Sequence, residues 1–298
     1  MRWPLGLFLV LGAVACSSED PAGAGLTPAP AGTSPPTAPA GGGDGAAPSL
    51  DGGGQTAADG AALDAAVATT LRPGDQTLSL TVAGKARTAL VHAPASVGAR
   101  PIPLVLALHG NGDTAQNFVK TSGLLAASDA DGFVLVAPQG VRQTITFGGQ
   151  TIPDVSWDGY RSAGEGSIDL PLFDELRTRL LATGAIDTKK IVVYGYSQGG
   201  YASFRWALEA SAALSCSAVI AAANPFGGGG RIGQMARKLP FALQIGSRDP
   251  AAANAAATSA ALKQAGHSVS YVEVPNAGHV PIPGDARAPL TFCLGQQL

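Results

Sequence analysis

Apolar runs alternate with polar, glycine-ended stretches through residues 71–298 of this 298-residue chain. Two runs of alternating character come first, and a short Ala-Gly-Lys stretch between them predicts a β-hairpin. The later runs are continuously apolar, as is typical of strands buried on both faces, and helical spacing marks the segments between them. We therefore expect an α/β fold, with a mostly parallel sheet and helices on both faces. The expected strands lie within QTLSLTV, ARTALVHAP, IPLVLALHG, GFVLVAPQG, KKIVVYGYS, CSAVIAAANP, PFALQIGSRDP and SVSYVEVPNAGH, and the clearest helices within IDLPLFDELRTRLLATG and AAANAAATSAALKQAG.

The first 70 residues have a different pattern. Residues 1–16 contain Arg2, an apolar run and a small-residue Ala-Val-Ala end, which predicts a secretory signal that is too short for a permanent membrane span. Cys16 directly follows this end and resembles the lipidated cysteine of bacterial lipoproteins, so we expect an exported protein with a lipid anchor in the cell envelope. Plain secretion is the alternative. Residues 17–70 form a Pro/Gly/Ala tract without aromatic residues, which predicts a disordered tether.

The charge and the cysteine content of the chain bear on nucleic-acid binding, metal binding and disulfide formation. Residues 71–298 contain 18 basic and 15 acidic residues, and no basic run with interleaved aromatics, so nothing supports nucleic-acid binding. No CxxC or Cys/His cluster suggests a metal. An exported location permits a disulfide between Cys216 and Cys293, but the sequence leaves open whether they pair or stay as buried thiols.

The stretch IVVYGYSQGGYASFRWAL, residues 191–208, places Ser197 between an expected strand and an expected helix. The flanking glycines let the strand and the helix approach closely, as in a nucleophile elbow. A serine hydroxyl is a poor nucleophile unless a histidine takes its proton and an acid orients that histidine. The sequence therefore has to supply both partners at the same edge of the sheet.

Histidine and acid candidates follow from the strand order. His279 comes after the strand SVSYVEVP and so lies at the same edge as Ser197, whereas His267 precedes that strand and is expected as a solvated loop residue about 20–25 Å away. His92, in the amino-terminal hairpin, is expected to be structural. Asp249 leaves a strand at the same edge, and the chain order Ser197, Asp249, His279 is that of α/β-hydrolases.

Four other acids compete with Asp249. Asp285 follows the histidine and so breaks the chain order. Asp169 and Asp174 begin or lie in a helix, where we expect acids to favour solubility and the helix dipole. Asp158 remains a rival.

Acyl transfer also needs backbone donors for the developing oxyanion. One expected donor is the amide of Gln198, which directly follows the nucleophile. The other is the amide of Asn111, in the glycine-rich turn after the strand LVLALHG. His109 ends that strand, and we expect it to shape the loop rather than to act as a base.

Several of these motifs together resemble a known superfamily. PIPLVLALHGNGDTAQNF, GFVLVAPQG, SWDG, IDTKKIVVYGYSQGGYASF, GSRDP and NAGH are similar, in order and spacing, to exported esterases of the polyhydroxybutyrate depolymerase and feruloyl esterase superfamily. LHGNGDT and GYSQGG also resemble the related acyl-protein thioesterase and carboxylesterase family. The resemblance implies an α/β-hydrolase fold, a triad of Ser197, Asp249 and His279, and a second oxyanion donor in the loop at Asn111.

Two departures from the superfamily leave the substrate open. No tryptophan soon follows His279, and a longer segment, VRQTITFGGQTIPDV, precedes Trp157. The expected function is hydrolysis of carboxylic esters, such as polyester, feruloyl, acetyl or short acyl esters, with no cofactor or metal required. An acyl thioesterase or a serine peptidase with the same triad is the alternative, and a non-catalytic surface binding protein is a second one.

The stretch FGGGGRIG is the remaining motif. Gly228, Gly230 and Gly233 match a dinucleotide-binding pattern, but the match lies far along the chain and not in an opening βαβ unit. We expect instead a mobile loop near the active-site edge.

Overall fold

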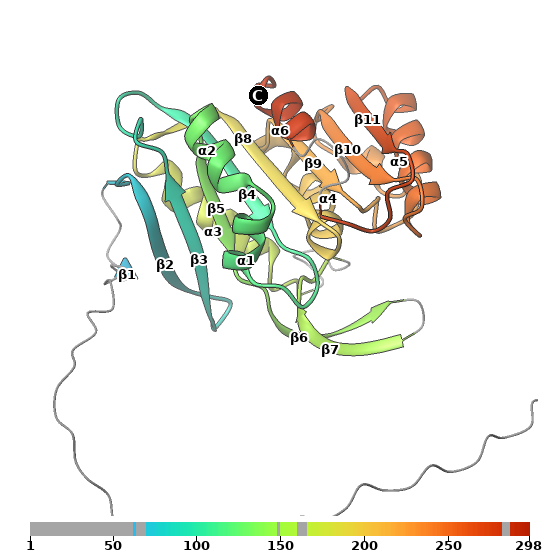
Figure 1. The fold of residues 1–298 in the computed structure, drawn as a ribbon, viewed down its shortest axis with the longest axis horizontal. Coiled ribbons are helices and arrows are strands. Elements are labelled where there is room, and N and C mark those ends of the chain that lie inside the picture. The colour runs from blue at the N-terminus through green and yellow to red at the C-terminus, as the bar shows by residue number, and fades with distance from the viewer. Residues whose placement is uncertain (1–61, 64–69, 148–149, 160–165, 282–286) are drawn as a thin grey trace, which may run out of the picture. The chain divides into compact units, whose positions relative to one another are not determined.

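The computed structural model describes residues 62–63, 70–147, 150–159, 166–281 and 287–298 (Figure 1). All of them belong to one unit, Thr56–Leu298. The expected signal sequence with Cys16, and nearly all of the expected tether, lie outside the described residues, so those expectations remain predictions.

Each of the eight stretches in which the sequence predicts a strand contains a strand of the main sheet. Within the described residues it has nine strands in the order β1-β2-β3-β5-β4-β8-β9-β10-β11. β3 runs antiparallel to β2 and β5, and the other neighbouring pairs are parallel, so the predicted hairpin and mostly parallel sheet are confirmed. The strands are β1 (Ala62–Leu63), β2 (Gly74–Val82), β3 (Lys85–Ala93), β4 (Ile102–Leu108), β5 (Val134–Pro138), β8 (Ile186–Tyr196), β9 (Cys216–Ile220), β10 (Phe241–Gly246) and β11 (Val269–Val274).

Helices cover both faces of this sheet (Figure 1). On one face lie α1 (Ala115–Thr121), α2 (Leu124–Asp131) and α6 (Arg287–Leu294). On the other lie α3 (Leu170–Leu181), α4 (Gln198–Ala210) and α5 (Ala252–Gln264). Two short 3-10 helices, Ser211–Ala213 and Ile232–Gln234, complete the helical elements of the described chain.

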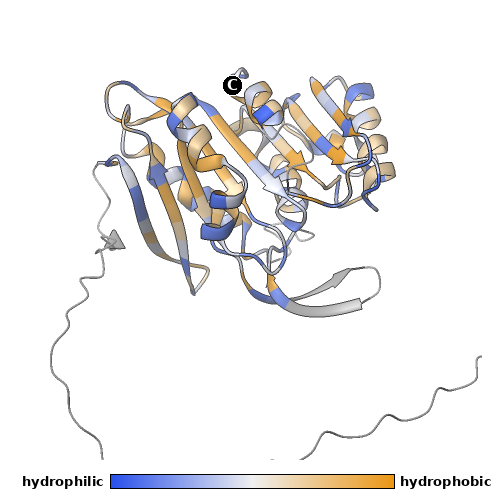
Figure 2. Ribbon diagram, in the orientation of Figure 1, coloured by the Kyte–Doolittle hydropathy of each residue, from blue (hydrophilic) through white to orange (hydrophobic). Residues whose placement is uncertain are grey.

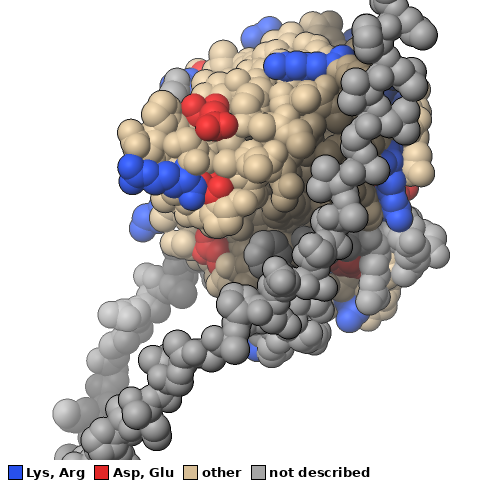
Figure 3. Space-filling view, turned by 90° about the vertical axis from the view of Figure 1, so that its right-hand side faces the viewer, with Lys and Arg blue, Asp and Glu red and all other residues tan. Residues whose placement is uncertain are grey.

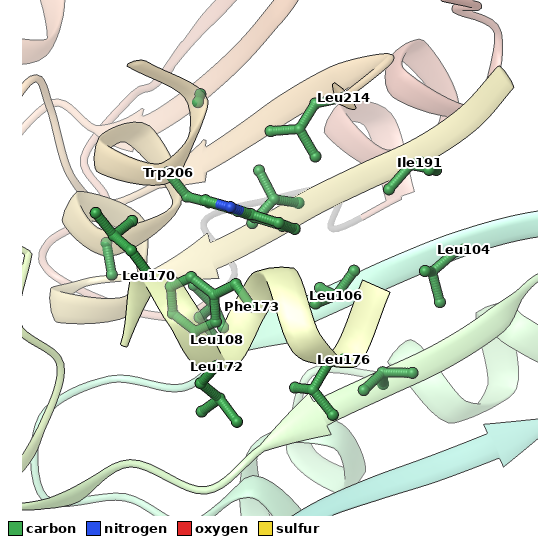
Figure 4. Close-up of a cluster of buried hydrophobic side chains, with 14 of the residues drawn as sticks. Leu104, Leu106, Leu108, Leu170, Leu172, Phe173, Leu176, Ile191, Trp206 and Leu214 are labelled. Carbon is green, nitrogen blue, oxygen red and sulfur yellow. The ribbon is translucent and has the colours of Figure 1, made fainter. Parts of the chain in front are cut away.

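The central strands divide the core into two layers. Successive side chains of β4 point to opposite faces, so Leu104 and Leu106 pack toward α3 while Val105 packs toward α1, all fully buried. Figure 4 shows Phe173 of α3 and Trp206 of α4 over these leucines, and their ring centroids are 5.4 Å apart. Figure 2 shows hydrophobic, orange stretches along the central strands.

The segment before Trp157 is a second, two-stranded sheet. β6 (Val141–Phe147) pairs antiparallel with β7 (Gln150–Ser156), and the hairpin projects from the body of the domain (Figure 1). In the sequence, this segment stands out only as a longer stretch before Trp157. Its alternating pattern around a Gly-Gly pair is a hairpin signal that was missed.

A disulfide joins Cys216 of β9 to Cys293 of α6, which settles the pairing that the sequence leaves open. Both cysteines are fully buried. The bond closes a loop of 77 residues and fastens the last helix to β9, an inner strand of the sheet.

On the side drawn in Figure 3, where β11 and α5 lie, acidic and basic side chains are interspersed among uncharged ones. No helix in the described residues is both long enough and apolar enough to cross a bilayer.

His92 of β3 makes two carboxylate contacts. Its Nδ1 lies 2.6 Å from Asp75 Oδ1 and its Nε2 3.1 Å from Asp129 Oδ1. Partial burial of the ring lowers the His92 pKa, but the hydrogen bonds and charges of the two aspartates outweigh burial and raise it above 6.5. The stability from these contacts is therefore fully present below the unfolded-state pKa and is lost as the pH rises through the folded-state pKa.

We expect His92→Gln to lower Tm by a few degrees at about pH 5.5 and by less at about pH 8.5, because exposed ion pairs contribute roughly 0.2–1 kcal/mol. Thermal melts of both proteins at both pH values test this. An equal Tm difference at the two pH values would contradict it.

Candidate active site

Ser197 sits in a sharp turn between β8 and α4. Its backbone has φ 53° and ψ −121°, a conformation that non-glycine residues rarely adopt. A Cβ on Gly195 would lie 2.0 Å from Gly199 O, and a Cβ on Gly199 would lie 2.1 Å from Leu108 O of β4. Only glycine fits at both places. These two glycines therefore allow β8, α4 and β4 to pack closely beneath the serine.

The side chains of Ser197, His279 and Asp249 form a continuous hydrogen-bonded relay. His279 Nε2 lies 2.8 Å from Ser197 Oγ, and His279 Nδ1 lies 2.7 Å from Asp249 Oδ2. The Asp249 side chain is 1% exposed and that of His279 is 42% exposed. With Asp249 as a carboxylate, Nδ1 donates to it and Nε2 is free to accept the serine proton.

Neighbouring parallel strands bring the acid and the histidine together. β10 pairs with β11 over its whole length. Two backbone hydrogen bonds also join the loops that follow the carboxyl ends of these strands. Ser247 N donates to Val274 O, and Arg248 N donates to Ala277 O, both at 2.9 Å. A Cβ on Gly246 would lie 2.3 Å from Ala277 O, so a glycine at this strand end lets the histidine loop approach.

Buried contacts fix the acid further. Asp249 Oδ1 accepts a hydrogen bond of 2.8 Å from Ala251 N, which leaves Oδ2 for the histidine.

Tyr196 packs beside His279 with a ring-centroid distance of 5.5 Å. Burial, and to a lesser degree the charges of Asp249 and Asp113, raises the pKa of Tyr196, so its phenol stays neutral at pH 7.

The two predicted oxyanion donors come from segments that lie against the serine. The N–H groups of Gln198, at the start of α4, and of Asn111 have no acceptor within the described residues. A Cβ on Gly110 would lie 3.5 Å from Ser197 Cβ, so the loop after β4 reaches the nucleophile. The N-terminal end of α4 also favours negative charge at this place.

His109 holds the base of that loop, as the sequence predicts. The ring is fully buried, its Nε2 accepts 3.0 Å from Gly140 N, and its Nδ1 lies 2.7 Å from Gly110 O. Burial lowers the pKa of His109, so the ring is neutral with both nitrogens engaged.

Trp157 links the elbow to the same loop. Its indole Nε1 donates to His109 O at 2.8 Å, and its carbonyl accepts from Gln198 Nε2 at 2.9 Å. The side chain is fully buried, so Trp157 is a structural link rather than part of a pocket wall.

Two of the rival acids, Asp169 and Asp174, bind other side chains. Asp169 is buried rather than solvated, which corrects the expectation, because its carboxylate pairs with Arg87 at 2.7 Å and accepts from Asp158 N at 2.6 Å. Asp174 accepts from Trp206 Nε1 at 3.2 Å. Asp285 lies outside the described residues.

One further expectation from the sequence, for His267, needs correction. His267 lies just before β11, as expected, but it is buried rather than solvated, since Nδ1 lies 2.9 Å from Leu239 O and the ring packs edge-on against Phe241. In the glycine-rich stretch, Asn224 Nδ2 donates to Gly228 O and Gly230 O at 3.0 and 2.8 Å. The mobility of this loop stays a prediction.

Two contacts of the loop after β4 were not predicted from the sequence. Asn111 Nδ2 donates 2.9 Å to Asp154 Oδ2, and Gly112 N donates 2.8 Å to Val155 O. Asp154 is 43 residues from Asn111, and no local pattern signals a contact over that separation. Recognising the hairpin of β6 and β7 would have been the necessary first step.

Comparison with known proteins identifies the family. Residues 75–244, more than half of the chain, match the family model described as chlorophyllase. The chain belongs to the chlorophyllase family. The sheet order and the elbow at Ser197 agree with an α/β-hydrolase fold.

One curated relative is "Putative esterase NocK" of Nocardia uniformis subsp. tsuyamanensis, 34% identical over 134 residues. That alignment covers 43% of this chlorophyllase-family chain and 36% of the relative, so the chain spans about a third of the relative's length.

Solved structures share the fold at lower identity. A thermostable esterase has a TM-score of 0.58 and 17% identity, over 75% of this chain and 63% of its own. LpqC, a poly(3-hydroxybutyrate) depolymerase from Bordetella parapertussis, has a TM-score of 0.54 and 17% identity, over 75% and 88%. These likenesses support the α/β-hydrolase fold that the strand order predicts.

Proposed function

We propose that this chain is a serine esterase that hydrolyses carboxylic esters through Ser197, His279 and Asp249. The observation that carries the proposal is the unbroken relay of 2.8 and 2.7 Å from the serine hydroxyl through the imidazole to a buried carboxylate. The strained backbone at Ser197 adds support, because such strain is retained where it places a reactive group.

The acylation step follows from the positions of these atoms. Ser197 Oγ attacks the ester carbonyl carbon while His279 Nε2 takes its proton, and the carbonyl oxygen becomes an oxyanion that accepts from the amides of Gln198 and Asn111. As the intermediate collapses, the imidazolium gives its proton to the leaving alcohol. Asp249 holds the Nδ1–H tautomer and stabilises the imidazolium.

Deacylation follows the same steps, with water in place of the serine hydroxyl as the nucleophile. His279 takes a proton from a water molecule, which attacks the acyl carbon and forms a second oxyanion. The proton then returns to Ser197 Oγ as the acid leaves, so the enzyme is regenerated.

Export is part of the proposal. The signal-like residues 1–16, Cys16 and the Pro/Gly/Ala tract are typical of an envelope lipoprotein, which would keep the esterase tethered at a membrane surface. The disulfide between Cys216 and Cys293 supports an oxidising compartment.

Relatives suggest substrate classes to try first. The LpqC structure is named as a poly(3-hydroxybutyrate) depolymerase, and the family description names chlorophyllase. Polyester, feruloyl, acetyl and short acyl esters are therefore the leading candidates for this chain.

A substrate panel with the full chain and Ser197→Ala tests the activity. We expect hydrolysis of p-nitrophenyl acetate and longer acyl esters, and a loss of kcat by about 10³-fold or more in Ser197→Ala, because the nucleophile is removed. The exposed serine of β2 supplies the control, and Ser79→Ala should match the wild type. Faster turnover of matched thioesters or amides would instead favour a thioesterase or a peptidase.

A folded wild-type chain that hydrolyses none of these compounds would contradict the proposal and favour a non-catalytic binding protein. If the Ser197→Ala variant replaced the wild-type protein in the cell without a change in phenotype, that result would also favour a non-catalytic binding protein.

A further inference from the structure

The segment from Asp154 to Trp157 holds the predicted oxyanion loop at three points. Gly112 N donates to Val155 O at 2.8 Å, Trp157 Nε1 donates to His109 O at 2.8 Å, and Asn111 Nδ2 donates to Asp154 Oδ2 at 2.9 Å. The first two contacts use backbone atoms of the loop. The third uses the side chain of the residue whose amide is the predicted oxyanion donor.

The Asp154 carboxylate is itself held in place. Its Oδ1 accepts 2.7 Å from Val155 N, so one oxygen is fixed on its own strand while the other reaches the loop. Each oxygen faces an N–H group, and hydrogen bonds to a carboxylate are the stronger kind.

The loop backbone packs closely against this carboxylate. Gly112 has φ 74°, and a Cβ there would lie 3.1 Å from Asp154 Oδ2. A left-handed glycine allows both the turn and the close approach. The turn that carries the Asn111 amide therefore lies against β7.

We infer that Asp154 is a positioning residue for the oxyanion hole, acting through the side chain of Asn111. The inference rests on the proposed function, and it gives the β6–β7 hairpin a role in that reaction. With Asp154 in place, the Asn111 backbone N–H is held in one orientation before substrate binds. Preorganised donors are what lower the barrier in acyl transfer.

The test compares Asp154→Ala, Asn111→Ala and the double variant in the full chain. Asn111→Ala keeps the backbone N–H and removes only the side chain, so both single variants break the same hydrogen bond from opposite sides. We expect each to lower kcat by about tenfold, with KM changed by less than about threefold, because the other two contacts still hold the loop. The double variant should be no slower than the slower single variant.

Two other readouts separate positioning from general damage. A boronic acid that forms a tetrahedral adduct with the serine should bind about tenfold more weakly to each variant, in parallel with kcat. Hydrogen–deuterium exchange of the peptide spanning 109–113 should be faster in each, while Tm and exchange of α4 stay as in the wild type. Arg142→Ala, an exposed change in β6 of the same hairpin, is the control and should behave as the wild type.

Unchanged kcat and inhibitor affinity in both single variants of an active wild type would overturn the inference and leave the proposed function intact. Additive losses in the double variant would also overturn it, because the two side chains would then act separately. A wild type that hydrolyses no ester would overturn the proposed function, which the wild-type control reveals before any variant is compared.

Discussion

Replacing Asp249 by asparagine is expected to lower kcat on p-nitrophenyl esters by about 10⁴-fold, with KM changed by only a few fold. The reason lies in the two partners of the Asp249 carboxylate. Ala251 N donates to one oxygen, so the single oxygen of an asparagine would stay there and its NH₂ group would face His279. His279 Nδ1 would then have to accept, and Nε2 would carry the proton that it needs to lose before it can take one from Ser197.

Asp174→Asn is the matched control for this prediction. Asp174 was a rival acid in the sequence, and its contact with Trp206 Nε1 needs only an acceptor oxygen, which asparagine keeps. We expect its kcat within about twofold of the wild type. Asp249→Asn with nearly full activity, beside an unchanged circular dichroism spectrum, would remove Asp249 from the relay.

Replacing Gly199 by alanine is expected to lower the free energy of unfolding by about 3 kcal/mol or more and to abolish activity. The new Cβ would lie 2.1 Å from Leu108 O and 2.5 Å from His109 O, which belong to the backbone at the end of β4. Alanine favours a helix over glycine by about 1 kcal/mol, so the clash has to outweigh that gain. Relief of the clash would move α4 or the oxyanion loop, and either movement separates the groups at the site.

Urea denaturation of the full chain measures this effect, with Gly233→Ala as the control. Gly233 lies in the 3-10 helix Ile232–Gln234, and a Cβ there meets nothing within 4 Å. We expect that variant within about 0.5 kcal/mol of the wild type. Equal midpoints for the two alanine variants would show that the elbow is not closely packed against β4.

The strands, and the gathering of Ser197, Asp249 and His279 at one edge of the sheet, could be predicted from patterns along the chain. Continuous apolar runs mark buried parallel strands, and residues after such strands share one edge of the sheet. That rule brought Ser197, Asp249 and His279 to the same edge, and the distances between them agree with the chemistry that each was assigned.

Contacts that depend on long-range packing could not be predicted in the same way. The buried state of Asp169 follows from Arg87, which is 82 residues away, and the pairing of Cys216 with Cys293 spans 77 residues. His267 was expected in solvent because it lies in a loop. A loop position does not indicate whether a side chain folds back onto the core, as this one does onto Leu239 and Phe241. The link from Asp154 to Asn111 needed the β6–β7 hairpin first.

Covalent labelling tests most directly whether Ser197 is an activated nucleophile. A fluorophosphonate reacts with an activated serine by forming an oxygen–phosphorus bond as fluoride leaves, and peptide mass mapping locates the adduct. We predict one adduct on the peptide that contains Ser197, formed rapidly in the wild type and far more slowly in Asp249→Asn. An adduct on another serine, or none on a folded wild-type chain, would contradict the account.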